Sequence, residues 1–215
     1  MSQLSYELFL SEVTPYVRDV PDMVAVQAIR NATIEFCEKT RVLQLQLDPM
    51  TAIALESEYD LDAGAGYKVV DIMEAWYGDQ LLIPKAVEEL TRIYRTSNWN
   101  DLDGNPYYYY RMRTQVINLV PMPKVTEANK IKIRAAVTPT RASTAIDDEI
   151  FERYFEHICL GARARLYDTA NQPYYDPKSA QVYLKRFSDA IAHTRTSVTK
   201  GLTRASVQIE YQRWV

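Results

Sequence analysis

The sequence predicts an α+β protein: a helical bundle, made of N-terminal helices and a C-terminal helical hairpin, with an inserted antiparallel β region and an extended C-terminal tail. Apolar residues recur at helical spacing before residue 41 and again after residue 147, whereas between these segments they alternate with polar residues in short runs. We therefore divide the 215 residues into N-terminal helices (1–41), a β region with a short helix (42–140), the helical hairpin (141–201) and the tail (202–215).

The N-terminal part predicts two helices. Leu8, Phe9 and Val13 indicate a short first helix that Pro15 interrupts. Pro21 begins a second helix, which we expect to end near Thr40. Because its apolar residues recur at steps of four and three, they form one face, which we expect to lie in the core. These residues are Ala25, Ile29, Ala32 and Phe36.

The middle of the chain predicts several short strands and one helix. Leu43, Leu45 and Leu47 alternate with polar residues, which is typical of a half-buried strand. Gly78 can take a positive φ angle at little cost, so residues 77–80 indicate a hairpin turn. The other expected elements are a strand with Ile53 and Leu55, a strand at 67–76, a brief helix from Pro84 to Tyr94, and three antiparallel strands at 107–110, 116–120 and 131–135.

Two long helices form the predicted hairpin. The first begins at the acids 147–149, which suit the partial positive charge of a helix N-terminus, and Arg163 is expected opposite its apolar face. The second begins at the N-cap Asp176 with Pro177 and ends at Gly201. The two apolar faces comprise Phe151, Phe155, Ile158, Ala162 and Leu166 in the first helix, and Tyr183, Phe187, Ala190, Ile191, Thr194 and Val198 in the second.

Length and composition are those of a folded globular protein, with 47% hydrophobic and 25% charged residues. The net charge of −3 argues against broad affinity for nucleic acid or anionic membranes. Residues 178–215 nevertheless carry seven Lys or Arg and two Asp or Glu, which is a local charge of +5. This basic end indicates either an acidic partner or an ordinary solvated helix face, and the sequence leaves both open.

The sequence gives no indication of export, of a membrane span or of a disulfide. Glu7 and Glu12 occupy the segment where a signal peptide would be basic. No apolar run approaches the roughly 20 residues that cross a bilayer. Cys37 and Cys159 fall in different predicted helices, so we expect two reduced core cysteines in a protein assembled in the cytosol.

The tail after Gly201 is patterned like a strand, although the last helix has already ended. Val207, Ile209 and Tyr211 alternate with polar residues, and Trp214 follows. An extended segment can add a strand to a partner or occupy a groove, where backbone hydrogen bonds give affinity and alternate side chains give specificity. We therefore predict that these four side chains dock a partner. The alternative is an edge strand packed on its own subunit.

Signals for catalysis are weak. The two histidines lie on different predicted helices without the companions of a metal site. Two pairs of neighbouring carboxylates have the residue type that cleaves glycans, but both pairs lie at predicted helix starts, where acids are favourable without any catalysis. We therefore predict no catalytic, cofactor-binding or metal-binding residue. The candidates weighed are His157, His193, Asp147 with Glu149, and Glu88 with Glu89.

Two further segments resemble binding motifs. Residues 101–105 resemble a calcium loop, but their glycine is the fourth residue, whereas an EF-hand needs it at the sixth, so we expect a turn. The run Tyr107–Tyr110 has the aromatic content of a base-stacking surface but few basic neighbours. We interpret it as strand tyrosines that pack in a sheet or between subunits.

Several segments follow one another in a recognisable order. Glu35–Thr40 ends a helix that begins with proline, Glu74–Tyr77 lies in a strand, and Leu119–Pro123 forms a turn after the tyrosine-rich strand. The helices at 147–166 and 177–200 complete the order. Over nearly its whole length the chain resembles the head-to-tail adaptor proteins of tailed bacteriophages, also called head-completion or connector proteins. It is similar to their tail tubular protein A type, found in short-tailed phages.

The resemblance implies a structural role in the virion. Such adaptors form a ring, usually dodecameric, that joins the portal to the tail at the head-tail junction and lines the DNA exit channel. The implied partners are the portal protein, the tail nozzle or other tail proteins, and genomic DNA that passes without sequence recognition. Assembly would take place in the host cytoplasm, with no membrane contact. Because the C-terminal segment of such adaptors reaches into the portal, residues 202–215 would be a portal-docking tail.

Two functions of other classes remain as alternatives. The first is a tail-associated cell-wall (peptidoglycan) hydrolase, which turnover of purified peptidoglycan would reveal. The second is a host-derived regulatory or DNA-binding module, which salt-sensitive retention of DNA would reveal.

Overall fold

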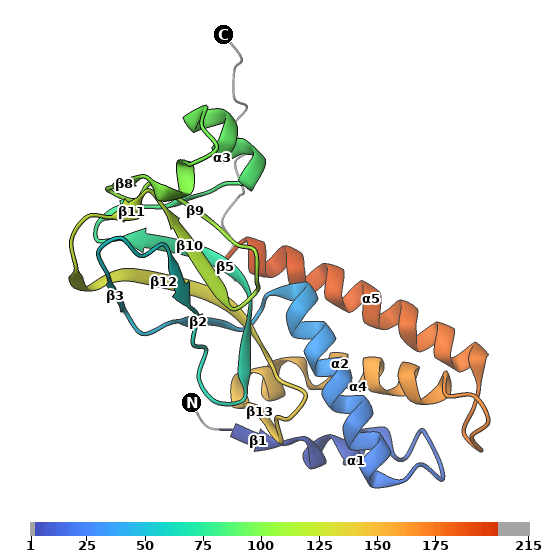
Figure 1. Ribbon diagram of the computed structural model, residues 1–215. Coiled ribbons are helices and arrows are strands. Elements are labelled where there is room, and N and C mark those ends of the chain that lie inside the picture. Colours follow the sequence, from blue (N-terminus) through green and yellow to red (C-terminus); the bar gives the residue numbers. More distant parts are fainter. Residues whose placement is uncertain (1–2, 202–215) are drawn as a thin grey trace. The chain divides into compact units, whose positions relative to one another are not determined.

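The computed structural model describes residues 3–201, and the chain divides there into two units. One unit contains the described residues up to 42 and from 141 onward, and the other contains Leu43–Thr140. Each unit buries apolar side chains of its own. The helices of the first unit and the strands of the second can be followed in Figure 1.

Helices make up most of the first unit. Its elements are β1 (Gln3–Ser5), η1 (Tyr6–Phe9), α1 (Leu10–Val13), α2 (Asp22–Thr40), β13 (Ala145–Asp147), α4 (Asp148–Tyr167) and α5 (Pro177–Thr199). Helices α2, α4 and α5 pack against one another, and η1 and α1 pack on α2 (Figure 1). The short strands β1 and β13 pair antiparallel.

Aromatic side chains fill the centre of this unit. The Phe36 ring lies 5.1 Å from the Tyr154 ring and 6.3 Å from the Phe187 ring, measured between centroids. The predicted apolar stripe of α2 is fully buried, which confirms the phase of that helix. All six residues of the predicted stripe of α5 are buried or half-buried, and the opposite face is exposed.

Arg163 does not lie on the exposed side of α4, where the sequence predicted it. The sequence placed it opposite the apolar face, but only 6% of the residue is exposed. Its Nη2 donates to a carboxylate oxygen of Glu12 at 2.5 Å, and its guanidinium lies 3.8 Å from the centroid of the Tyr16 ring. A buried charge needs such a partner, and this one comes from 151 residues earlier in the chain.

The second unit is built mainly of strands. Its elements are β2 (Gln44–Gln46), β3 (Met50–Ala52), β4 (Glu58–Asp60), β5 (Tyr67–Tyr77), β6 (Gln80–Leu81), β7 (Ile83–Pro84), α3 (Val87–Tyr94), η2 (Trp99–Asp101), β8 (Asp103–Gly104), β9 (Tyr108–Tyr110), β10 (Val116–Val120), β11 (Met122–Pro123) and β12 (Glu127–Pro139). The long strands β5 and β12 pair antiparallel in a sheet of order β2-β12-β5-β6, and β3 also pairs with β12. A second sheet has the order β4-β10-β9-β7.

Several predicted details of this unit are confirmed. The turn at 77–80 forms, because Tyr77 pairs with Gln80 and Gly78 has a φ angle of +60°. The tyrosines of β9 alternate between environments: Tyr109 is buried, whereas Tyr108 and Tyr110 pack against a cluster of apolar side chains from α3, η2 and β10.

Other predicted details of this unit were wrong, because a strand can pair with a segment far away in the sequence and local patterns do not identify that partner. Of the three strands predicted to pair after residue 106, β9 and β10 do so, whereas β12 lies in the other sheet. Strand β3 ends at Ala52, which leaves Ile53 and Leu55 exposed, the latter with a φ angle of +62°. Residues 101–105, expected as a turn, include β8, which pairs with β11.

The predicted fold class, a helical bundle with an inserted β region, was wrong. The structure is mixed, with 41% helix and 28% strand, and it is β-rich. The described residues contain thirteen strands, of which eleven lie between Leu43 and Thr140. These strands bury a core of their own, which includes Ile117, Ile131 and Ile133. The sequence undercounted them because nine of those eleven strands are only two to five residues long.

Candidate functional site

The four side chains predicted to dock a partner are Val207, Ile209, Tyr211 and Trp214, and they lie outside residues 3–201. Their docking role therefore stays a prediction. The described part of the chain supplies other candidates.

The carboxylate pairs weighed for catalysis lie at helix starts. Asp147 is the N-cap of α4, where its carboxylate accepts a hydrogen bond from the backbone N–H of Glu149 at 3.1 Å. Glu88 and Glu89 lie in the first turn of α3. A hydrogen bond from Lys85 at 2.9 Å lowers the pKa of the Glu89 carboxyl. Each pair thus has a local structural role.

The two histidines lie on neighbouring helices, His157 on α4 and His193 on α5. The His157 ring stacks on the Phe36 ring at 6.1 Å, and burial lowers its pKa below the ordinary value, against the opposing effect of Glu156. Within residues 3–201 no group of three His, Cys, Asp or Glu side chains is arranged to hold a metal ion.

The two cysteines are free and buried, which confirms that both lie in the core. Burial raises the pKa of the Cys37 thiol to about 12, and that of the Cys159 thiol to about 12 as well. Because the thiolate is the nucleophilic form, neither thiol is activated for chemistry at neutral pH.

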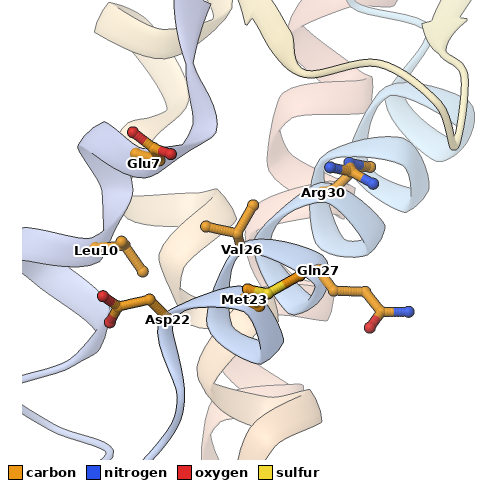
Figure 2. Close-up of a pocket in the computed structure, with 7 residues that line it drawn as sticks. All are labelled: Glu7, Leu10, Asp22, Met23, Val26, Gln27 and Arg30. Atoms are coloured by element: carbon orange, nitrogen blue, oxygen red, sulfur yellow. The ribbon is translucent and has the colours of Figure 1, made fainter.

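A hollow of about 530 Å³ lies between the N-terminal segment and the first turns of α2 (Figure 2). Some of the residues that line it are apolar and others are acidic. Leu10, Met23 and Val26 line it, and Figure 2 shows Glu7 and Asp22 on the same side as Leu10. We call this the α2 hollow; it is lined by Glu7, Leu10, Asp22, Met23, Val26, Gln27 and Arg30.

Met23 is the most exposed of the large apolar side chains that the structure describes, at 86%. It lies two residues before Ala25, which begins the buried stripe, so it projects from the opposite side of α2. Exposed apolar side chains bordered by polar ones are typical of docking surfaces.

Arg30 closes the other end of the α2 hollow. Its Nη1 donates to the carbonyl oxygen of Arg141 at 3.0 Å, and its guanidinium lies 5.7 Å from the centroid of the Tyr6 ring. These contacts hold the positive charge away from Glu7 and Asp22, as Figure 2 shows. The end of the hollow near those two carboxylates is therefore acidic.

The outer face of α5 forms a second candidate surface. Its residues recur at steps of three and four and are all exposed, so they line one face of the helix. Leu184 is its one large apolar side chain, at 54% exposure, and Lys185 and Arg195 supply positive charge. We call this the α5 ridge; it consists of Gln181, Leu184, Lys185, Ser188, Ala192 and Arg195.

Reasoning from the sequence missed the α2 hollow, and on the outer face of α5 it did not single out Leu184. It followed the apolar stripes that point into the core, whereas Met23 and Leu184 are apolar residues outside those stripes. An apolar residue on the polar face of an amphipathic helix is the signal that would have found them.

Comparison with known proteins identifies a family. A family model described as SU10 adaptor protein matches residues 5–208. No curated protein matches the chain. No helix within residues 3–201 has the length and apolar content that crossing a membrane would require.

Proposed function

Because this chain belongs to the SU10 adaptor protein family, we propose that it is a virion structural protein that joins the portal to the tail at the head-tail junction of a tailed phage. The observation that carries the proposal is the family match, which covers residues 5–208 and so both units. An adaptor has a structural role, with portal and tail proteins as its partners and no reaction to catalyse. The finer likeness to the tail tubular protein A type stays a prediction.

We include ring formation in the proposal, with several copies around the DNA exit channel and the genome passing without sequence recognition. A dodecamer is the number that the resemblance implies. Weak contacts by each copy suit such an assembly, because the overall affinity of the ring is much higher than that of one copy when all copies bind together.

The portal contact is assigned to the C-terminal tail. Burying Tyr211 and Trp214 would contribute on the order of a few kcal/mol per copy. The entropy lost when a segment is ordered on binding opposes this by roughly 1–2 kcal/mol per residue for the backbone. Contacts that are marginal for one copy are thus compatible with firm attachment of a ring.

Deletion of residues 203–215 tests the proposal. We expect a folded, soluble protein that no longer joins portal-bearing capsids. Trp214→Ala with Tyr211→Ala should weaken attachment in the same direction, whereas Gln208→Ala with Gln212→Ala, on neighbouring positions of the same tail, should leave it unchanged. A truncated chain that attaches as well as the full chain would contradict the tail assignment.

An assay for release of soluble fragments from purified peptidoglycan separates the proposal from the hydrolase alternative. The full chain should release none. Turnover that disappears when one carboxylate is neutralised would replace the adaptor function with a cell-wall hydrolase.

A further inference from the structure

We propose that copies of this chain contact one another by inserting the α5 ridge of one copy into the α2 hollow of the next. The inference rests on the proposed ring and names the two surfaces that would build it. In a ring of more than two subunits each contact joins two different faces of the same chain, so the two faces must complement each other. The first unit presents two such faces.

The α2 hollow and the α5 ridge consist of different residues of the first unit, so one copy can present both. The hollow lies at the N-terminal end of α2, around Met23. The middle of α5 lies instead beside the C-terminal end of α2, where Ser188 and Arg195 border the same depression as Lys39. At 1.5 Å per helical residue, Met23 and Lys39 are separated by about 24 Å along α2.

The chemistry of the two faces matches. The hollow offers the apolar walls of Leu10, Met23 and Val26, and the ridge offers Leu184 as an apolar knob. Insertion would remove exposed apolar surface on both sides from water, which is the main favourable term in association.

The charges match as well. Glu7 and Asp22 lie beside the apolar walls of the hollow, and Lys185 follows Leu184 on the ridge. Within residues 3–201 none of these three charged side chains has an ion-pair partner in its own chain. A partner of opposite charge in a second copy would therefore replace no ion pair formed among residues 3–201, and it would favour the encounter and fix its orientation.

Two single substitutions in the full chain test the contact. The measurement is the mass distribution of the assemblies that each variant forms, first alone and then mixed with purified portal rings. Met23→Asp disables the hollow and Leu184→Asp disables the ridge, and both positions are exposed enough for the fold to tolerate the change. We expect each variant to lose every species that holds two or more copies in contact, whereas the unmodified chain forms rings.

The two variants mixed together give the sharpest result. A copy with only its ridge intact and a copy with only its hollow intact share one working contact, so the mixture should form pairs and nothing larger. Matched controls are Val182→Asp, on the same helix outside the ridge and 51% exposed, and Met112→Asp, a 76% exposed methionine in the other unit. Both controls should assemble like the unmodified chain.

A disulfide experiment places the two surfaces directly. Met23→Cys and Leu184→Cys chains, mixed and oxidised, should give cross-linked pairs, whereas Met23→Cys mixed with Val182→Cys should not. The native thiols do not interfere, because Cys37 and Cys159 are buried.

The outcomes separate this inference from the proposed function. Assembly that survives both aspartate substitutions, an unmodified chain that stays monomeric even on portal rings, or cross-linking at Val182 in place of Leu184 would overturn the inference. Single copies that still attach to portal-bearing capsids would leave the adaptor function intact while refuting the contact. Rings that assemble as described but ignore the portal would refute the function and leave the contact standing.

Discussion

Gly161 lies against the ring of Phe187, and this approach brings α4 and α5 together. A Cβ atom on Gly161 would lie 2.8 Å from two ring carbons of Phe187 and 3.0 Å from the Cβ of Ala32 on α2. Three helices therefore meet at the one glycine of α4. Its role is close approach, since Gly161 lies in the part of α4 that follows the kink at Tyr154 and has no positive φ angle to explain a glycine.

Gly161→Ala should destabilise the protein despite the higher helix propensity of alanine. The added methyl group overpacks the contact with Phe187, which we expect to lower the free energy of unfolding by about 1–3 kcal/mol. Thermal or urea unfolding measures the loss. Phe187→Leu in the Gly161→Ala background serves as the control, because the double variant should lose less than the sum of the two single changes. Simple additivity would show that the two residues are not coupled.

The ion pair of Arg163 with Glu12 should be worth more than any surface pair of α4. Arg163→Met removes a buried partner, and we expect a loss of about 2 kcal/mol, below the roughly 3–5 kcal/mol of a fully buried pair because Glu12 keeps a 39% exposed side chain. Urea unfolding gives the value. Arg153→Met is the matched control, since Arg153 lies 3.9 Å from Glu149 at the surface and should contribute less than about 0.5 kcal/mol. Equal effects at the two positions would contradict this account.

Acidification should weaken the fold through His157. Burial lowers the pKa of this imidazole in the folded state, so the unfolded chain binds its proton more readily. The contribution of neutral His157 is complete above the ordinary histidine pKa of about 6.5 and is lost as the pH falls through that value toward the lower folded pKa. We expect His157→Gln to flatten the decline in unfolding free energy between about pH 7 and pH 5. If the unfolding free energy of the variant falls with pH as steeply as that of the unmodified protein, other titratable groups cause the decline.

Both cysteines should resist thiol reagents while the protein is folded. Their raised pKa of about 12 keeps each thiol protonated, and burial excludes the reagent. Mass spectrometry after maleimide treatment at pH 8 should find no label in native protein and two labels after unfolding in urea. One label acquired rapidly under native conditions would show that Cys37 or Cys159 is accessible.

Local patterns were readable from the sequence wherever neighbouring residues decide the structure. The stripe that contains Phe36, the cap at Asp176 and the turn at Gly78 all depend on residues within one or two turns, and the structure confirms them. The strands of the second unit were harder, because short segments acquire their identity from partners far along the chain. Strand β4, for example, pairs with β10 across more than fifty residues.

The candidate sites likewise came partly from the sequence and partly from the structure. The tail residues Val207, Ile209, Tyr211 and Trp214 came from the sequence pattern, and their role stays a prediction. The α2 hollow needed the structure, because Leu10 and Met23 face the same space only after the N-terminal segment folds against α2.

The sequence by itself determined the helix phases of α2 and α5, the core position of both cysteines and the resemblance to phage adaptors. Only the tertiary structure decided that Arg163 is buried, that the strands between Leu43 and Thr140 form a unit with its own core, and that Met23 borders a hollow. The physical reason is the distance along the sequence over which each interaction acts. Backbone periodicity and capping act over a few residues, whereas the burial of a charge or the pairing of a short strand depends on a partner that folding brings from elsewhere in the chain.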